Sequence, residues 1–208
     1  MTGAEIVAMF EGMVDDSIDS TLAYQLLNNA KDKVEGEREW EMLKKLDTST
    51  SASSSPITLP SDWNRTIGIF VGTTEFFQIP FEQQKQFNGS GRHWYLDLKN
   101  SRYYFTGSPS GTVNHFYIYQ TDDITSGTSP VWPARFHPLL ALEMAELFFS
   151  IDQGERNFAW DDKFLVQKTL LKNAMVDWDV KLGKRAIENA AFQLTTGDDS
   201  IESVIANL

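Results

Sequence analysis

Residues 54–72 read SSPITLPSDWNRTIGIFVG, and in this stretch the pattern of the chain changes from helix to strand. Two prolines flank a short apolar run, and β-branched residues then occupy every second position over 67–71, which is typical of a half-buried strand. Pro60 fixes its own φ and has no N–H to donate to a sheet. We therefore expect the chain to turn at Pro60 and enter a β-sheet, with Trp63 anchoring the corner in apolar surface.

The residues before this stretch favour helices. Over 4–14 the apolar residues recur at intervals of three and four, and a second amphipathic helix is expected to begin with Asp19 or Ser20 as its N-cap. Trp40 extends the apolar character of this second helix, so that roughly the first 50 residues are predicted to be helical. Residues 47–55 are rich in Ser and Thr, whose hydroxyl groups compete with regular backbone pairing, and we expect a linker there.

The residues after this stretch predict first a sheet and then helices. Over 56–122 short runs of alternating apolar residues are separated by turn signals, which indicates an antiparallel meander. Pro138 suits the first turn of a third, buried helix, and 161–192 is expected to form a long fourth helix. The fourth helix has an apolar stripe at intervals of three, four and seven residues, formed by Phe164, Leu171, Met175, Trp178 and Leu182.

The predicted fold class is therefore α+β. We expect a bundle of about four helices that is interrupted by an inserted antiparallel β-sheet, because the helices on either side of the sheet need one another to cover their apolar stripes. An extended C-terminal tail follows. The expected segments are N-terminal helices and linker at 1–54, a β module at 55–126, C-terminal helices at 127–192 and a docking tail at 193–208.

Composition limits the possible functions. The 208 residues carry a net charge of −11, which is the wrong sign for wrapping DNA or an anionic membrane surface. The absence of cysteine excludes disulfides, thiolate metal sites and a cysteine nucleophile. We find neither a signal-peptide pattern nor 18 consecutive apolar residues, and we expect a chain that does not span or bind a membrane.

The sequence offers no support for an enzyme. The three histidines lack the spacing of a metal site, and no phosphate-binding loop, nucleophile elbow or dinucleotide fingerprint is present, so we expect no catalytic residue, no cofactor and no metal. One alternative remains open, a sugar- or receptor-binding tail module in which exposed aromatic residues of the β module form a stacking platform. The candidates for that platform are Tyr103, Tyr104, Tyr117 and Tyr119.

Four short motifs occur in an order that resembles the head-to-tail connector (adaptor) proteins of tailed bacteriophages. They are LLNNA at 26–30, EWEML at 39–43, ITLPSDW at 57–63 and PARFHPLLA at 133–141, and the resemblance extends over about residues 5–185. The residues of these motifs that we expect to act as structural anchors are Trp40, Pro60, Trp63, Pro133 and Pro138.

This resemblance implies a structural virion protein. Adaptors of this kind form a homo-oligomeric ring, usually of twelve copies, which joins the portal protein to a downstream tail or nozzle protein. The genomic DNA would pass through the lumen of the ring as cargo, without sequence-specific binding. From the net charge of −11 we add the hypothesis of an acidic lumen, which would let the DNA slide. The expected location is the head–tail interface of the virion, after assembly in the host cytoplasm.

The C-terminal tail carries a further expectation. Apolar residues recur there at intervals of three and four, which suits docking on a neighbouring protein, and adaptors often use terminal extensions to clasp the portal. The candidate docking residues are Ile201, Val204, Ile205 and Leu208. The alternative is that this segment folds back on its own bundle.

Overall fold

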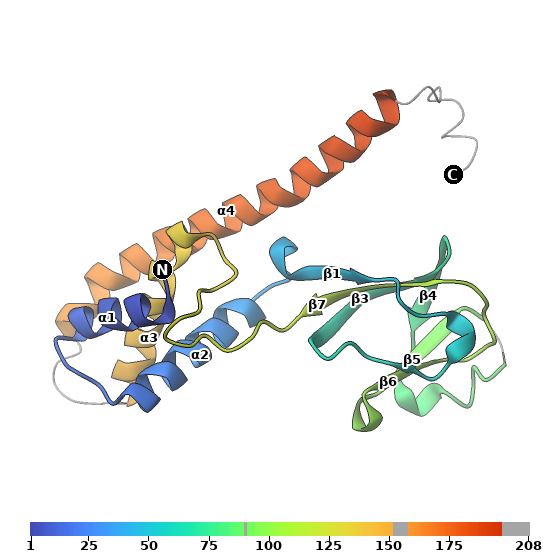
Figure 1. The fold of residues 1–208 in the computed structure, drawn as a ribbon, viewed down its shortest axis with the longest axis horizontal. Coiled ribbons are helices and arrows are strands. Elements are labelled where there is room, and N and C mark those ends of the chain that lie inside the picture. Colours follow the sequence, from blue (N-terminus) through green and yellow to red (C-terminus); the bar gives the residue numbers. More distant parts are fainter. Residues whose placement is uncertain (90, 152–157, 197–208) are drawn as a thin grey trace. The chain divides into compact units, whose positions relative to one another are not determined.

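The computed structural model describes residues 1–89, 91–151 and 158–196. Within these ranges, side chains are described for all residues except 151–163 and 185–196. The chain divides into two compact units (Figure 1). The helical unit comprises Met1–Met42 together with Asp122–Leu208, and the β unit comprises Leu43–Thr121. The β unit is thus inserted between the second and third helices in sequence.

The helical unit contains four α-helices: α1 (Gly3–Val14), α2 (Ser20–Gly36), α3 (Pro138–Ile151) and α4 (Phe158–Thr196). The side chain of Thr2 caps α1 and forms a capping box with Glu5. The carboxylate of Asp19 caps α2 by accepting hydrogen bonds from the amides of Thr21 and Leu22, which confirms the N-cap predicted there.

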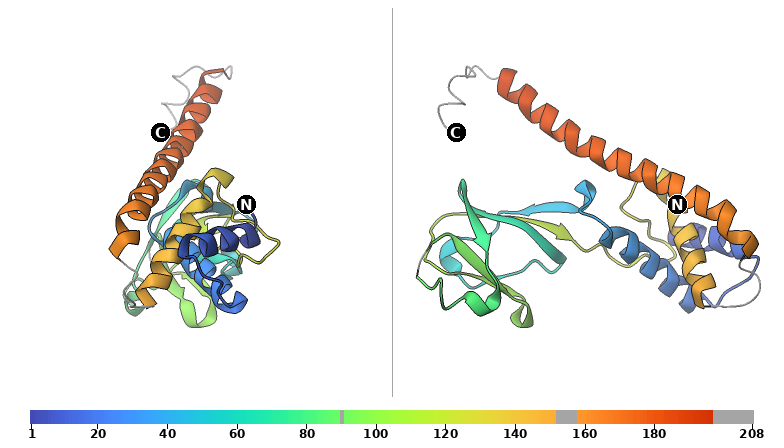
Figure 2. Two further views of the ribbon diagram at one scale, coloured as in Figure 1. Left: turned by 90° about the vertical axis from the view of Figure 1, so that its left-hand side faces the viewer. Right: turned by 180° about the vertical axis from the view of Figure 1, so that it is seen from behind.

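Helix α3 forms the centre of the helical unit and packs against the other three helices (Figures 1 and 2). It begins at Pro138, as predicted, and Leu139, Leu140 and Met144 are completely buried in it. Its partners contribute apolar faces of their own, such as Phe10 of α1, whose ring meets the ring of Phe148 edge to face. Helix α4 continues well beyond the other three helices (Figure 2).

The start of α1 is fixed against the segment that returns from the β unit. Gly3 donates a backbone hydrogen bond of 2.8 Å to the carbonyl of Thr128, and Ala4 donates one of 3.2 Å to Ser126. A Cβ atom at Gly3 would collide with the carbonyl oxygen of Thr125. A residue without a side chain is therefore required at this position.

The β unit is one curled seven-stranded sheet with the strand order β1-β7-β3-β4-β5-β6-β2 (Figure 1). Its strands are β1 (Lys44–Asp47), β2 (Ile57–Thr58), β3 (Trp63–Val71), β4 (Thr74–Gln78), β5 (His93–Asp97), β6 (Arg102–Phe105) and β7 (Val113–Tyr119). Five 3₁₀ turns complete the described elements: η1 (Glu41–Leu43), η2 (Ala52–Ser54), η3 (Phe81–Gln83), η4 (Leu98–Asn100) and η5 (Ala134–Phe136).

The core of the β unit lies on the inner face of the curled sheet. It is built largely from aromatic and β-branched residues, which suit a pleated surface: Ile57, Ile69, Val71, Phe76, Trp94, Tyr103, Phe105 and Val113. The indole of Trp94 donates a hydrogen bond of 3.0 Å to the carbonyl of Phe76, so that its polar atom is satisfied inside this core.

One buried histidine lies beside this core. His115 on β7 is 1% exposed, and its Nε2 lies 2.9 Å from the hydroxyl of Thr66, which also accepts a hydrogen bond of 3.0 Å from the indole of Trp63. Burial lowers the pKa of His115 from 6.5 to about 4, although the nearby carboxylate of Asp47 raises it. The imidazole is therefore neutral at physiological pH.

The α+β fold class and the order of four helices with an inserted sheet are confirmed, but three details of the prediction are wrong. Helix α2 ends at Gly36, and residues 44–47 form strand β1 instead of continuing a helix. The segment at 47–55 contains η2 and a β-bridge from Ser51 to Thr112, so it is more regular than a linker. Strands β4 and β5 pair in parallel, whereas the remaining strand pairs are antiparallel.

Candidate partner-binding surface on the last helix

Ion pairs connect helix α4 to the rest of the helical unit. Lys168 lies 3.0 Å from the completely buried Glu143 and 2.7 Å from Glu146, both on α3. Lys33 of α2 reaches the same two carboxylates, at 2.7 and 2.5 Å. Burial alone would raise the pKa of Glu146, but its hydrogen bonds to the two lysines lower it to about 2. Three helices are thus joined by one charged cluster.

A second polar contact lies farther along α4. Asp179 is completely buried and accepts a hydrogen bond of 2.8 Å from the amide of Glu41, while the guanidinium of Arg38 lies 3.5 Å away. Burial raises the pKa of Asp179, and these two partners oppose the shift. Among the described α4 side chains, only Asp179 and Met175 are fully buried. Phe164, Leu171 and Trp178 are half-buried, so apolar contacts as well as polar ones hold α4 in the helical unit.

Much of the apolar surface of α4 remains exposed. Val166 and Leu170 lie one turn apart and are 58% and 64% exposed, and Ala174 continues the same row at the next interval of four. We call these three residues the α4 ridge. Leu165 is also 53% exposed. Exposed large apolar residues that lie together on one helix are typical of a surface that binds another protein.

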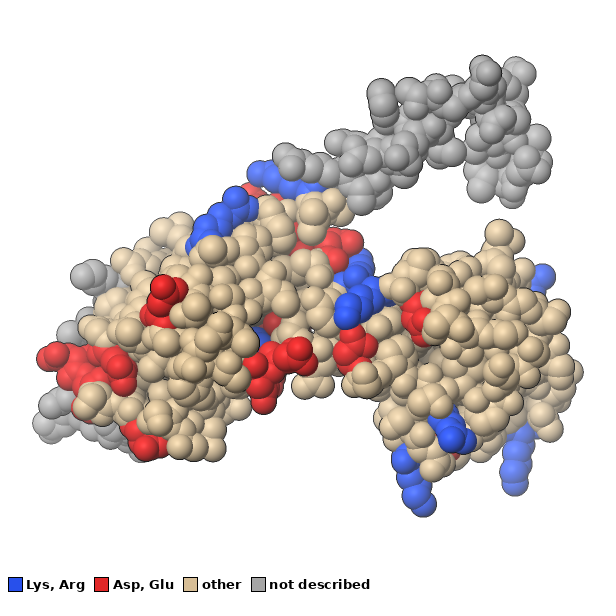
Figure 3. Space-filling model, in the orientation of Figure 1, with Lys and Arg blue, Asp and Glu red and all other residues tan. Residues whose placement is uncertain are grey.

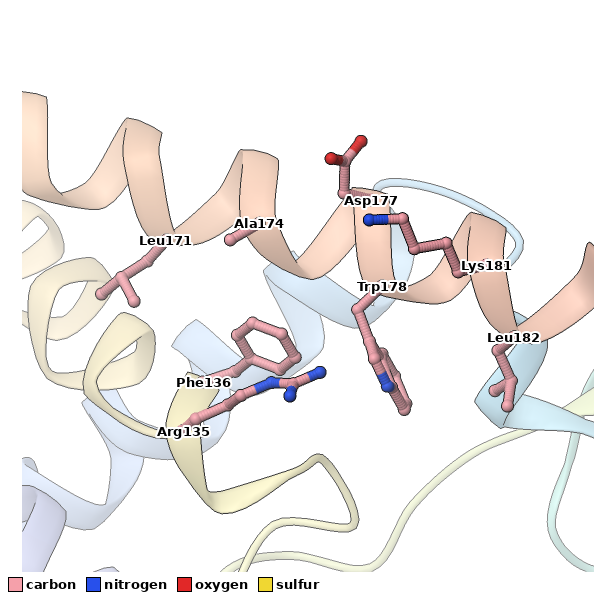
Figure 4. A pocket seen from close by; sticks show the side chains of 8 residues that line it. All are labelled: Arg135, Phe136, Leu171, Ala174, Asp177, Trp178, Lys181 and Leu182. Carbon is pink, nitrogen blue, oxygen red and sulfur yellow. The ribbon is translucent and has the colours of Figure 1, made fainter.

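The ridge leads into a groove between α4 and η5, with a volume of about 610 Å³ (Figure 4). Figure 4 shows the ring of Phe136 below α4, with Arg135 beside it and the indole of Trp178 projecting from the helix. The guanidinium of Arg135 lies 4.7 Å from the centre of the Phe136 ring and 5.8 Å from that of Trp178. The groove therefore combines aromatic walls with a positive charge.

The predicted anchors are distributed over both units. In the helical unit, Trp40 is 1% exposed and donates a hydrogen bond of 2.9 Å to the carbonyl of Val34. Pro133 immediately precedes η5 and Pro138 begins α3, so the motif at 133–141 builds the η5 wall of the groove. In the β unit, Pro60 accepts a hydrogen bond of 3.0 Å from the amide of Trp63, where β3 begins.

The candidate docking residues of the tail, Ile201, Val204, Ile205 and Leu208, lie outside the described residues. Sequence reasoning identified the stripe of α4 that includes Met175 and Trp178, but it missed the α4 ridge. The signal was present, because apolar or small residues also recur at intervals of four from Val166.

The proposed sugar-stacking platform is not formed as expected. Tyr103 and Tyr117 are buried, at 1% and 5% exposure, and both rings contact the His115 ring. Tyr104 stacks on Tyr95 with a ring separation of 5.2 Å, and Tyr119 lies under the ammonium group of Lys45. These rings are used for packing within the sheet.

Within the described ranges, no three His, Cys, Asp or Glu side chains gather in a way that would hold a metal ion. The described helices also include none that is both long and apolar enough to cross a bilayer. Other large apolar side chains are exposed within the described residues, among them Phe77 and Leu98 of the β unit. We take the α4 ridge, with the groove at its end, as the candidate surface because its residues form one row on a helix.

The comparison with known families agrees with the order of motifs. The model of the SU10 adaptor protein family matches residues 1–183, which include α1 to α3, the β unit and the described side chains of α4 up to Gly183. No curated protein matches the chain. The chain belongs to the SU10 adaptor protein family, a family of structural phage head–tail adaptors and not of enzymes.

Proposed function

We propose that the chain assembles into a ring, of twelve copies, between the portal protein and a downstream tail or nozzle protein. Membership of an adaptor family supports this proposal because an adaptor must bind other virion components. The observation that carries it is the α4 ridge, since Val166 and Leu170 expose apolar surface on a helix that ion pairs already hold in place. Covering such an apolar surface with another protein lowers the free energy of the system.

We further propose that the genome passes through the lumen of this ring. The net charge of −11 repels a phosphate backbone, so the DNA would slide as cargo instead of binding. The ring would lie at the head–tail interface of the virion after assembly in the host cytoplasm.

Electron microscopy of the purified chain, imaged alone and with the portal protein of the same phage, tests the proposed function. We expect a closed ring stacked on the portal. The control is the portal imaged without the chain, which should lack this additional layer. Peripheral or fibre-like placement of the chain on virions would contradict the proposal and would favour a receptor-binding module.

The C-terminal segment is proposed as a second contact, in which residues 193–208 dock on the portal. Its support is the sequence pattern of Ile201, Val204, Ile205 and Leu208, which places apolar residues at helical intervals. Deletion of residues 197–208 should leave a folded chain that fails to attach to portal-bearing heads. Attachment equal to that of the full chain would contradict this proposal.

A further inference from the structure

We infer that neighbouring copies of the chain contact one another through the α4 ridge of one copy and the outer side of α1 of the next. The outer side of α1 carries Ala4, Ala8 and Gly12, which we call the α1 stripe. This inference rests on the proposed ring and adds to it the two surfaces that join the copies. Both surfaces belong to the helical unit.

The α4 ridge has the form of a row that inserts into a groove. Its residues recur every four positions, and such rows are the ridges of the commonest class of helix packing. Leu170 and the buried Met175 are five positions apart, which places them about 140° apart around the helix axis. Leu170, and Val166 one turn before it, therefore face away from the side by which α4 is held, and Ala174 lies where the ridge reaches the groove beside η5.

The α1 stripe has the complementary form. Ala4, Ala8 and Gly12 are all exposed and also recur every four positions, so together they leave a shallow groove along α1. A Cβ atom at Gly12 would meet nothing within 4 Å, which shows that the end of this groove is open. The opposite side of α1, with Ile6 and Phe10, is completely buried in the helical unit. The small residues would let a partner helix approach to about 8 Å between axes.

Charge favours the pairing of these two surfaces over the pairing of like surfaces. Residues 1–37 contain eight Asp and Glu but only two Lys, and Glu5 and Glu11 of these lie on α1 itself. Residues 163–185 contain six Lys and Arg but only two Asp, and two of the lysines, Lys168 and Lys172, are paired within the chain. Figure 3 shows acidic side chains gathered where α1 and α2 meet, and basic side chains along α4. Opposite potentials attract and like potentials repel, so α4 is expected to meet α1 of another copy.

The symmetry of such a contact agrees with a ring. The ridge and the stripe are different surfaces, and both are exposed in the single chain. A copy that uses its ridge to bind one neighbour can therefore still use its stripe to bind a second neighbour. A contact between two different surfaces is heterologous, and when its rotation closes it generates a ring. A contact between two identical surfaces would stop at a dimer.

Cysteine cross-linking tests the inference cleanly because the chain has no cysteine of its own. The two variants Ala8→Cys and Leu170→Cys are purified separately, mixed on portal under conditions in which the wild-type chain forms rings, and treated with a short bis-maleimide. We expect the mixture to give a covalent dimer and each variant alone to give none. The double variant should give a ladder of larger species. The matched control is Leu98→Cys, because Leu98 lies in the β unit and its side chain is 64% exposed. This variant should not cross-link to Ala8→Cys.

A second pair of variants tests the same contact without cross-linking. Leu170→Asp and Ala8→Trp should each abolish rings and leave the circular dichroism spectrum unchanged, because both positions are exposed in the single chain. Leu170→Asp retains an intact stripe and Ala8→Trp retains an intact ridge. An equal mixture of the two variants should therefore form dimers through these two surfaces and no larger species.

The outcomes separate this inference from the proposed function. Wild-type rings without a cross-link between Ala8→Cys and Leu170→Cys would overturn the inference and leave the proposed function standing. A dimer from either single-cysteine variant alone would show pairing of like surfaces, and a cross-link to the portal would show a different occupant, so either result overturns it. Failure of the wild-type chain to form any ring on the portal would refute the proposed function and the inference with it.

Discussion

Mild acidification is expected to destabilise the β unit because His115 stays neutral inside it. The pKa of this buried imidazole lies at about 4, against 6.5 for an exposed histidine. Below pH 6.5 the unfolded chain takes up a proton that the folded chain does not, so stability is complete above this pH and falls as the pH decreases toward 4. Between pH 7.5 and pH 5 the expected loss is about 2 kcal/mol.

Urea unfolding at pH 7.5 and pH 5, compared between the wild-type chain and His115→Phe, measures this effect. Phenylalanine keeps a ring between Tyr103 and Tyr117 but has no group that titrates. The variant should lose about 2 kcal/mol less on acidification than the wild-type chain. An equal pH dependence in the wild-type chain and His115→Phe would refute the reasoning.

Three further predictions concern the helical unit and are measured by urea unfolding at pH 7.5. Glu143→Gln should cost about 2–3 kcal/mol because it leaves the charge of Lys168, which is 13% exposed, without its buried partner. Glu146→Gln, at a carboxylate that is 44% exposed, should cost under about 1 kcal/mol, and equal losses would contradict the role of burial. Met175→Ala should lower the free energy of unfolding by about 2–4 kcal/mol because Met175 is buried, and Leu170→Ala by under about 0.5 kcal/mol because Leu170 is exposed. A larger loss for Leu170→Ala than for Met175→Ala would mean that the ridge packs within the chain. Gly3→Ala should destabilise by about 1–3 kcal/mol through a clash with a backbone carbonyl, and an unchanged midpoint would show that α1 shifts freely.

The helices could be predicted from sequence because their signals are local. Asp19 and Pro138 mark the helix starts, and the periodic stripe of α4 marks its course. Strand β1 could not be predicted in the same way. Lys44–Asp47 has no buried side chain, and the segment becomes a strand only by pairing with β7, about 70 positions later in the chain.

The candidate surface was harder to predict than the fold. A periodic pattern shows that α4 has an apolar stripe, but it does not show which of two stripes the rest of the unit covers. The structure settles this because Lys168 and Met175 lie on the covered side and Leu170 lies on the exposed side. The tyrosines of the sheet illustrate the same limit, since alternation along a strand does not distinguish the filled inner face of a curled sheet from its outer face.

The adaptor role predicts that α4 serves two purposes at once. Its ion pairs with α3 fix its position within the chain, and its apolar ridge remains available to a neighbour. Charged contacts suit the first purpose because they hold the helix without consuming the apolar surface that the second purpose needs.

The number of copies bound to one portal complex tests the central claim most directly. Native mass spectrometry of the reconstituted complex, with the portal alone as the reference, gives this number from the added mass. With a subunit of 23.6 kDa, a ring of twelve copies predicts an added mass of about 280 kDa. No added mass, or the mass of one copy, would contradict the claim that this chain functions by assembling into a ring on the portal.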